Sequence, residues 1–346
     1  MNADGAAASR IRVTFLGDTL IGGEAQATLD QFGPGYAFDG VRHLFDRSDV
    51  VVANHEGPIT RRNEPEFKVD AGRKRYWYRA QPEAISALLD IGVRVVSLGN
   101  NHVLDFGPDA LMDTTNALDA AGIQWCGAGA TRIAARRAAK ITVKGLRFGF
   151  LSFMQRYDLY VAERLYATKS KPGPLQLSLH RARVDLERLK QYADVRIALV
   201  HWGRNYRKRN PRQQRLAGEL ASAGADLVIG HHPHIPQPVE ITQRSPVCYS
   251  LGNGPLGTPG RFHSGRPPYG LVVSVDFDAQ GRARAMSAQI ILVDNALVHF
   301  QPRVADDPDA RRFLRRLLPR DLDWRSGDGA GLTCELDPHP TDVAQA

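Results

Sequence analysis

The chain has 346 residues, of which 43% are apolar and 24% are charged. This length and apolar content suffice for a sizeable core in one large α/β domain or in two small ones. The net charge of +8 suits an anionic partner, but the lysines and arginines are scattered among acids and form no basic stripe, which argues against nucleic acid as a partner. The three cysteines have no paired spacing, which argues against a disulfide framework and against a thiolate metal site.

The first ten residues, the apolar runs and the cysteines indicate the cellular compartment of the protein. Residues 1–10 have no apolar core, and no stretch approaches the ~18 apolar residues that a transmembrane helix needs. The unpaired cysteines fit a reducing compartment. We therefore expect a cytoplasmic protein with no membrane anchor.

Short apolar runs alternate with helical patterns along the first two thirds of the chain. The runs predict strands over residues 11–16, 50–53, 93–98, 195–200 and 226–229. The helical patterns cover residues 82–90, 108–121, 179–192 and 211–223. This alternation favours crossover units and a largely parallel sheet.

The last third of the chain has more closely spaced apolar runs, which predict antiparallel strands of a second sheet over residues 247–251, 271–277, 285–293 and 297–301. Residues 307–318 predict a basic C-terminal helix. Two long loops, over residues 60–75 and 252–269, are expected to overhang a functional site. We expect a two-sheet α/β sandwich over residues 10–302, followed by a C-terminal helix and tail over residues 303–346.

Polar side chains follow the predicted strands directly. They are Asp18, Glu56, Asn100, Asn101, His102, His201, His231, His232 and His234, with Asp105 one helical turn after His102. The carboxyl ends of parallel strands are where α/β sheets bind ligands. Imidazole, carboxylate and amide groups suit Zn²⁺, Mn²⁺ or Fe²⁺, so the pattern predicts a two-metal site.

The alternatives differ in strength from one motif to the next. Asp18 or Glu56 taken alone fits a short acid that caps a helix or closes a turn. Three imidazoles within residues 231–234 are harder to explain without a metal, because protonated neighbours that are buried repel one another. The histidine cluster is therefore the stronger indication of metal binding.

A basic run follows His201 and includes Arg204, Tyr206 and Arg207. It fits a solvated loop and equally a clamp for a carboxylate or phosphate beside the metals. His55 could line the pocket because it lies next to Glu56. The other histidines are expected to be surface or structural residues: His43, His180, His263, His299 and His339.

Six motifs follow one another in the order found in the CapA/PgsA capsule-synthesis family, so the chain resembles that family. The fold of the family is similar to that of the calcineurin-like metallophosphatases. The motifs are GDTLIGG at 17–23, NHEGPIT at 54–60, GNNHVLDFG at 99–107, HWGRNY at 201–206, GHHPHIPQPVE at 230–240 and YSLGN at 249–253. The resemblance extends from about residue 12 to residue 300. It implies an α/β sandwich of the metallo-dependent phosphatase type.

The resemblance also implies the roles of individual residues. Two divalent metal ions, among Mn, Zn, Fe, Ca and Mg, would be bound by Asp18, Glu56, Asn101, His201, His232 and His234. Glu56 would bridge them, His102 would be the nearby acid or base, and Asp105 would orient His102. Within the pairs Asn100–Asn101 and His231–His232, the sequence does not decide which member faces the metals.

Two enzymatic functions and one other role fit these residues. In the first, the chain is a peptide epimerase similar to soluble family members of lasso-peptide pathways. The metals would stabilise an enolate, His102 would act on one face of the α-carbon, and Asp105, His231, His55 or a metal-bound water would act on the other. In the second, it is a dinuclear-metal hydrolase of phosphoesters or γ-glutamyl amides. The third is a metal-stabilised binding protein without turnover.

Overall fold

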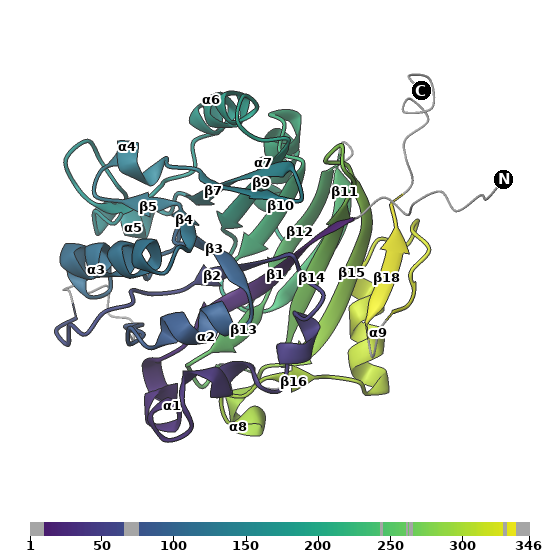
Figure 1. Cartoon of the computed structure of the whole chain (residues 1–346), viewed down its shortest axis with the longest axis horizontal. Helices are drawn as coiled ribbons and strands as arrows, with labels where there is room; N and C mark the ends of the chain where they lie inside the picture. The colour runs from purple at the N-terminus through teal and green to yellow at the C-terminus, as the bar shows by residue number, and fades with distance from the viewer. Residues whose placement is uncertain are drawn as a thin grey trace.

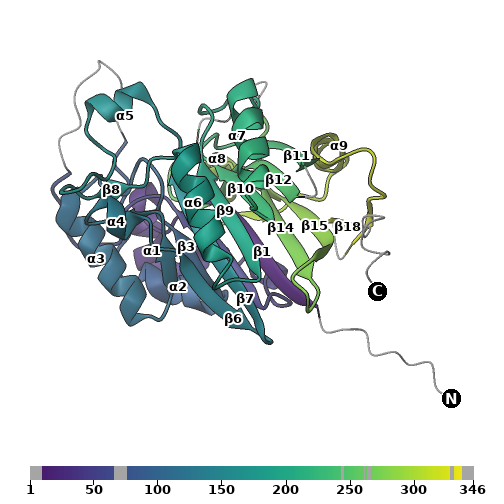
Figure 2. The same cartoon turned by 90° about the horizontal axis from the view of Figure 1, so that it is seen from above.

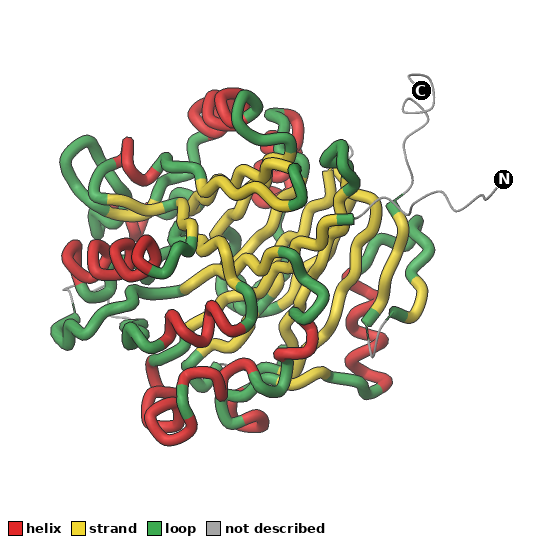
Figure 3. Tube along the Cα trace, in the orientation of Figure 1, coloured by secondary structure: helices red, strands yellow, loops and turns green. Residues whose placement is uncertain are grey.

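Two mixed β-sheets pack face to face, and helices lie outside them (Figures 1 and 3). The computed structural model describes residues 10–65, 76–242, 245–260, 262, 266–327 and 331–336. The expected two-sheet α/β sandwich is confirmed. None of the helices in these residues has the length and apolar content that crossing a bilayer requires.

The first sheet has the strand order β17-β18-β15-β14-β1-β2-β3-β4, with β13 beside β1 and β16 beside β15. Strands β1 to β4 run parallel, and β14 is antiparallel to β1. The strands are β1 Ile11–Leu20, β2 Val50–His55, β3 Val93–Ser97, β4 Gln124–Cys126, β13 Asn253–Leu256, β14 Tyr269–Phe277, β15 Ala283–Leu292, β16 Arg303–Val304, β17 Arg325–Ser326 and β18 Leu332–Glu335.

The second sheet has the order β11-β12-β10-β9-β7-β6, in which β7, β9, β10 and β12 run parallel. Its strands are β6 Ala139–Val143, β7 Leu146–Met154, β9 Val195–His201, β10 Leu227–His231, β11 Pro236–Thr242 and β12 Ser245–Leu251. A short antiparallel pair, β5 Ala128–Gly129 and β8 Gly173–Pro174, lies apart from both sheets.

The α-helices pack mainly on the outer faces of the sheets. They are α1 Gln26–Phe32, α2 Ala84–Asp90, α3 Gly107–Ala120, α4 Arg132–Ala135, α5 Asp158–Ala162, α6 Leu179–Leu189, α7 Pro211–Ser222, α8 Asn295–Val298 and α9 Pro308–Leu317. Helices α2 and α3 share a buried cluster with β1, β2 and β3. Figure 2 shows α6 and α7 beside β9 and β10, with which they share another.

The core between the sheets comes from alternate residues of neighbouring strands. In β7, Phe148 and Phe150 point to the other sheet, whereas Leu151 and Phe153 point to the outer helices. Parallel strands buried on both faces therefore read as continuous apolar runs. This is why the sequence marks the central strands clearly.

Two predictions about the last third of the chain are wrong. Residues 297–301 form no strand, because they belong partly to α8 and because His299 and Phe300 have positive φ values of 49° and 64°. The late strands also form no sheet of their own. Strands β14 and β15 extend the first sheet beside β1, whereas β12 joins the second sheet. Most of the predicted loop 60–75 lies outside the described residues.

Candidate metal centre

The carboxyl ends of parallel strands from both sheets bring the predicted polar side chains together. Asp18 in β1 is in register with Asn54 in β2 and with Asn253 in β13. In the second sheet, His231 at the end of β10 is in register with His201 at the end of β9. The side chains that follow these strands therefore share one rim of the sandwich, as the sequence pattern predicts.

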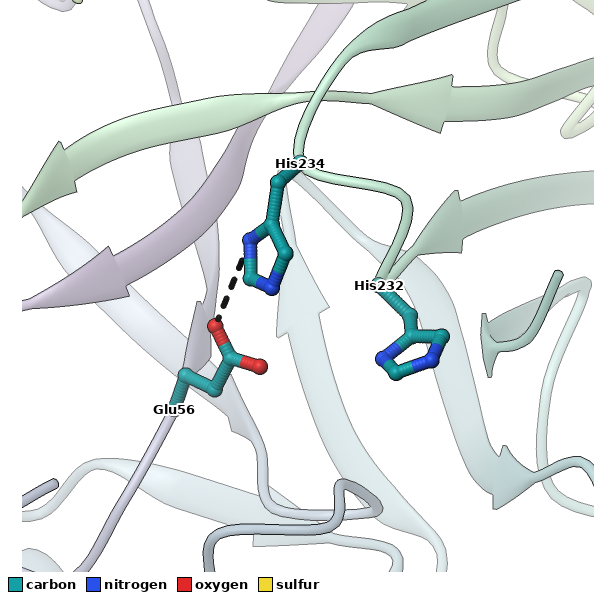
Figure 4. Close-up of side chains that lie close together, drawn as sticks. All are labelled: Glu56, His232 and His234. Atoms are coloured by element: carbon teal, nitrogen blue, oxygen red, sulfur yellow. Dashed lines mark ion pairs between the residues drawn. The ribbon is translucent and has the colours of Figure 1, made fainter. Parts of the chain in front are cut away.

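Two groups of buried side chains have the donor atoms and spacing to hold a metal ion. One group is Glu56, His232 and His234, and the other is Asp18, Glu56 and His201, with the ligand atoms of each group within 4.8 Å of one another. Figure 4 shows Glu56 facing His234, with His232 on the same loop after β10. Because Glu56 belongs to both groups, it stands where a bridging carboxylate would stand.

The distances between these atoms fit ligands that share a cation. Oε1 of Glu56 is 3.6 Å from Nε2 of His201, and Oε2 is 3.9 Å from Nδ1 of His234. Nδ1 of His234 is also 3.3 Å from Oδ2 of Asp18. Ligands about 2.1 Å from a tetrahedral cation lie about 3.4 Å from each other. The spacing thus leaves room for a cation among these atoms.

Buried polar atoms without hydrogen-bond partners give an independent test of this fit. Nδ1 of His232 and Oδ1 of Asn54 have none among the described residues. Buried polar atoms are normally satisfied. Lone pairs on imidazole nitrogen and amide oxygen are suitable donors for a divalent cation. The donor set therefore fits a metal.

Burial also sets the charge of the cluster. It lowers the pKa of His201 and of His232 well below the ordinary value, so both imidazoles are neutral at pH 7. Neutral imidazole is the form that binds metals. Burial raises the pKa of Asp18 to about 7, although hydrogen bonds from the His232 backbone and the Asn54 side chain oppose this. A cation would favour the ionised form of Asp18.

The structure resolves both pairs that the sequence left open. Oδ1 of Asn101 lies 2.7 Å from Nε2 of His201, whereas the side chain of Asn100 bridges the backbone between His55 and His102. The His232 ring lies 4.6 Å from the His201 ring. These contacts place Asn101 on the side of the cluster.

His231 and His55 are engaged with the backbone instead. Nε2 of His231 lies 3.0 Å from the carbonyl of Leu16, and Nδ1 of His55 lies 2.9 Å from the carbonyl of Gly57. Both rings are buried, and burial lowers the pKa of each to about 4. The contact of His231 joins β10 of the second sheet to β1 of the first. His232 is consequently the member of its pair that is turned toward the cluster.

The loop that carries the histidines is strained. His232 and His234 have φ values of 96° and 58°, a region that residues other than glycine rarely adopt. Each such residue costs of order 1–3 kcal/mol and persists only when its surroundings impose it. Here the backbone N–H of His232 donates to Asp18 (3.0 Å), and Nδ1 of His234 lies 2.9 Å from Oδ1 of Asn253. These contacts hold both rings beside Glu56 in spite of the strain.

His102 and Asp105 form a pair at the edge of the cluster. Nδ1 of His102 is 2.7 Å from Oδ2 of Asp105, and its Nε2 is 4.0 Å from Oε1 of Glu56. Tyr78 stacks on the His102 ring at 3.9 Å, and its backbone N–H donates to Asp105. The imidazole is thus fixed with Nε2 directed to the cluster, the arrangement of a proton donor or acceptor.

The residues of the predicted basic clamp differ in how far they are exposed to solvent. Arg204 and Arg207 are exposed, whereas the half-buried Tyr206 has its ring 5.7 Å from the ring of His234. Arg209 pairs with Glu240 and so has a structural role. The exposed positions of His43, His180 and His299 agree with their prediction as surface residues, and His263 and His339 lie outside the described residues.

Some side chains around the cluster were not predicted. Asn54 lies within a quoted motif, so the order of motifs could have identified it. Tyr78, Tyr157 and Arg266 lie in segments without a motif. Only the folded chain brings the two tyrosines against histidine rings and Arg266 over the Tyr206 ring. No local pattern marks such contacts.

The two-sheet α/β sandwich with acids and imidazoles at one rim is similar in fold to a solved phosphatase. The solved structure of a novel phosphatase from Mycoplasma pneumoniae aligns with a TM-score of 0.51, covering 88% of this chain and 97% of the phosphatase. The two sequences are 12% identical, so this likeness concerns the fold alone. It confirms the predicted phosphatase-type architecture.

The chain belongs to the family described as bacterial capsule synthesis protein PGA_cap, whose model matches residues 12–254. It is 31% identical over 250 residues to the capsule biosynthesis protein CapA of Bacillus anthracis, covering 70% of this chain and 59% of that protein. It is 37% identical over 216 residues to a probable polyglutamine synthesis accessory protein of Mycobacterium tuberculosis, covering 60% of this chain and 55% of that protein. The chain thus spans less than two thirds of either relative.

Proposed function

We propose that the protein is a dinuclear-metal hydrolase that cleaves γ-glutamyl amide bonds in an anionic chain. The observation that carries this proposal is the pair of buried ligand groups sharing Glu56, with Nε2 of His102 at 4.0 Å from that carboxylate. The names of the relatives, which refer to capsule and polyglutamine synthesis, support a polyglutamate-type substrate. The fold similarity to a phosphatase supports hydrolysis.

In this proposal the metals are held by the six residues that the resemblance implies, Asp18, Glu56, Asn101, His201, His232 and His234. Bound divalent cations would polarise the scissile carbonyl and lower the pKa of the attacking water. A donor set with three imidazoles suits Mn²⁺, Zn²⁺ or Fe²⁺ better than Ca²⁺ or Mg²⁺, which prefer oxygen ligands.

His102 would supply the proton that the leaving group needs. Water adds to the carbonyl carbon, the C–N bond breaks, and Nε2–H of His102 protonates the departing amine. Asp105 accepts a hydrogen bond from Nδ1–H and so stabilises the protonated imidazole. A proton of the attacking water then restores His102, which balances the reaction.

The remaining predicted residues take supporting roles. Arg204, Tyr206 and Arg207 would face the anionic substrate from the loop after β9. His231 would keep the two sheets in place through its contact with the Leu16 carbonyl. This role replaces our expectation that His231 is a second acid or base.

Hydrolysis replaces the peptide epimerisation that we expected first. The relatives described above are named for capsule and polyglutamine synthesis, and none of those names refers to epimerisation. Inversion of an α-carbon also needs proton transfer on two faces. Of the side chains that were candidates for the second face beside a metal-bound water, the rings of His231 and His55 contact backbone carbonyls, and Asp105 contacts His102 and the Tyr78 backbone.

The test is incubation of the Mn²⁺-loaded protein with a synthetic γ-glutamyl decamer, followed by mass spectrometry. We expect shorter glutamyl chains from the wild type and none from His234→Ala, which lacks a ligand. A panel of phosphate mono- and diesters is assayed in parallel. Cleavage of phosphoesters alone would refute the amide substrate, and no cleavage of either class would refute the hydrolase.

A further inference from the structure

A groove on the outer side of the second sheet is lined by residues of α4, α6, β6 and β7. Its volume is about 520 Å³, which is within the range of ligand-binding sites in proteins. Residues of α4, α6 and β7 belong to one buried apolar cluster, so the elements that carry the groove are packed firmly together. We call it the basic groove because four cations line it: Arg136, Arg137, Lys140 and Arg188.

The basic groove lies toward the opposite end of the strands from the candidate metal centre. Lys140 in β6 pairs with Gly149 in β7, which pairs with Arg196 near the amino end of β9. His201 is the last residue of β9, five residues and therefore about 17 Å further along the strand. A group bound beside Lys140 is thus too far from the histidine cluster to reach a metal there.

Two of the four cations have no acid beside them. Nζ of Lys140 lies 4.8 Å from the centre of the Tyr192 ring. Within the part of the chain that the structure describes, neither Lys140 nor Arg188 forms an ion pair or a side-chain hydrogen bond. Both side chains are exposed, and they stand on different elements, β6 and α6. Each is therefore available to an acidic group of a ligand.

The other two cations are held in place by the fold. Nε of Arg136 donates to the buried Asp185 at 3.0 Å, and Nη2 donates to the same carboxylate. The guanidinium carbon of Arg137 is 4.6 Å from the centre of the Trp125 ring, and its Nη2 pairs with Asp119 at 3.6 Å. Four cations against these two acids leave two positive charges in excess. The excess corresponds to the two cations that have no acid partner.

Apolar side chains stand beside the cations. Ile133 is 80% exposed, the highest fraction among the large apolar side chains that the structure describes, and Tyr192 is 56% exposed. Both line the basic groove. Nucleic acid would need open aromatic faces for its bases. Here Lys140 covers a face of Tyr192, and Arg137 covers a face of the buried Trp125. The mixture favours carboxylates on aliphatic stems.

We propose that the basic groove binds a peptide chain with several glutamate-type carboxylates and that this binding needs no metal. Lys140 and Arg188 pair with two carboxylates of the chain. Ile133 and Tyr192 contact the methylene groups that carry them. This inference goes beyond the proposed function, because it requires neither the metal centre nor cleavage.

The test is the affinity of the Mn²⁺-loaded protein for a dye-labelled decaglutamate peptide, measured by fluorescence anisotropy. The double variant Lys140→Gln/Arg188→Gln is expected to raise Kd about tenfold, roughly threefold for each exposed ion pair. The matched control is Arg315→Gln/Arg316→Gln, which removes two exposed arginines from α9 and has the same net charge. It should leave Kd within twofold. Equal losses in the two double variants would refute the groove.

Further variants guard against misfolding. Lys140→Arg/Arg188→Lys keeps both charges and should keep Kd within twofold of the wild type. Ile133→Glu places a carboxylate at the groove and should weaken binding more than the neutral Ile133→Gln, because like charges repel. Thermal melts of all variants check that the fold is retained. An Ile133→Glu variant that binds as tightly as Ile133→Gln would contradict the proposed position of the peptide.

Two competitors test the chemical class of the ligand. A single-stranded ten-nucleotide DNA should compete more weakly than unlabelled decaglutamate. If it binds more tightly and its binding depends on Lys140 and Arg188, the partner is a nucleic acid and the peptide is refuted. Inorganic phosphate at the same concentration should displace little of the peptide. Full displacement by phosphate would refute a site for a chain.

The metal-ligand variant His234→Ala separates this inference from the proposed function. It should bind decaglutamate as tightly as the wild type does, and weaker binding by His234→Ala would place the peptide at the metal centre and refute the groove. Binding that depends on Lys140 and Arg188 supports the groove even where the wild type cleaves nothing. A wild type that cleaves γ-glutamyl chains but whose Kd is unchanged in the double variant keeps the hydrolase and refutes the groove.

Discussion

Lowering the pH from 8 to 6 should weaken Mn²⁺ binding about tenfold, and we expect the loss to come from one carboxyl group, that of Asp18. Burial raises its pKa to about 7. At pH 6 a metal must therefore displace a proton from about nine tenths of the molecules, and at pH 8 from about one tenth. The fraction of molecules with an ionised Asp18, and with it the apparent affinity for Mn²⁺, is therefore about tenfold lower at pH 6 than at pH 8.

His201 and His232 should contribute nothing over the same range. Burial lowers the pKa of His201 and of His232 well below the ordinary value, so both are already neutral. Had each kept an ordinary pKa of about 6.5, each would add a further factor of about four between pH 8 and pH 6. The pH dependence therefore distinguishes a buried, preorganised cluster from a solvated one.

Calorimetric titration of the metal-free protein with Mn²⁺ at pH 6, 7 and 8 measures this directly. Repeating each titration in buffers of different ionisation enthalpy counts the protons released. We expect close to one proton at pH 6 and close to none at pH 8, and Asp18→Asn should bind more weakly and lose the pH dependence. Release of two or more protons at pH 6, or a loss of affinity near a hundredfold, would refute the reasoning.

Three other predictions concern single side chains. His102→Gln should keep its metals and lose turnover by about 10²–10⁴-fold, because it removes the proton donor alone; metal analysis with kcat checks this, and metal loss would contradict it. Gly230→Ala should lower the free energy of unfolding by about 3 kcal/mol or more, because its Cβ would lie 2.1 Å from the Tyr249 carbonyl oxygen. Gly218→Ala in α7, where a Cβ meets open space, should raise the free energy of unfolding by about 0.5–1 kcal/mol. Chemical denaturation compares the two variants, and equal effects would refute the packing argument. Metal-free His232→Gly should melt no lower than metal-free His232→Ala, because both lose the imidazole and only glycine releases the positive-φ strain; a lower Tm for His232→Gly would show that the backbone is not strained.

The central strands and the residues after them could be predicted because both carry local patterns. Strands such as β1 and β9 are buried on both faces and read as continuous apolar runs. Asp18 and His201 belong to the carboxyl ends of those strands, so their meeting at one rim follows from the parallel arrangement.

Strand pairing between distant segments could not be predicted in the same way. Strand β14 pairs with β1 across more than two hundred residues, and nothing local in its sequence distinguishes that partner from β12. The hairpin β6–β7 and the strand β11 were not anticipated either. Pairing depends on which apolar faces meet in three dimensions.

The details of the site were likewise beyond local patterns. Asn100 and Asn101 lie in a turn, where no periodicity decides which side chain faces inward. Arg266 lies within the stretch over residues 252–269, which is rich in glycine and proline, and its stacking on Tyr206 depends on the tertiary fold. The sequence therefore predicts the ligand types and the rim of the sandwich that holds them, but not the aromatic and basic side chains that surround them.

Metal stoichiometry tests the central claim most directly. The wild type, Glu56→Gln and His234→Ala would each be loaded with Mn²⁺, desalted and analysed by inductively coupled plasma mass spectrometry. We predict two ions per chain for the wild type, one for His234→Ala, which belongs to one ligand group, and none for Glu56→Gln, which belongs to both. A wild type without metal, or a Glu56→Gln variant that keeps both ions, would contradict the shared-carboxylate centre.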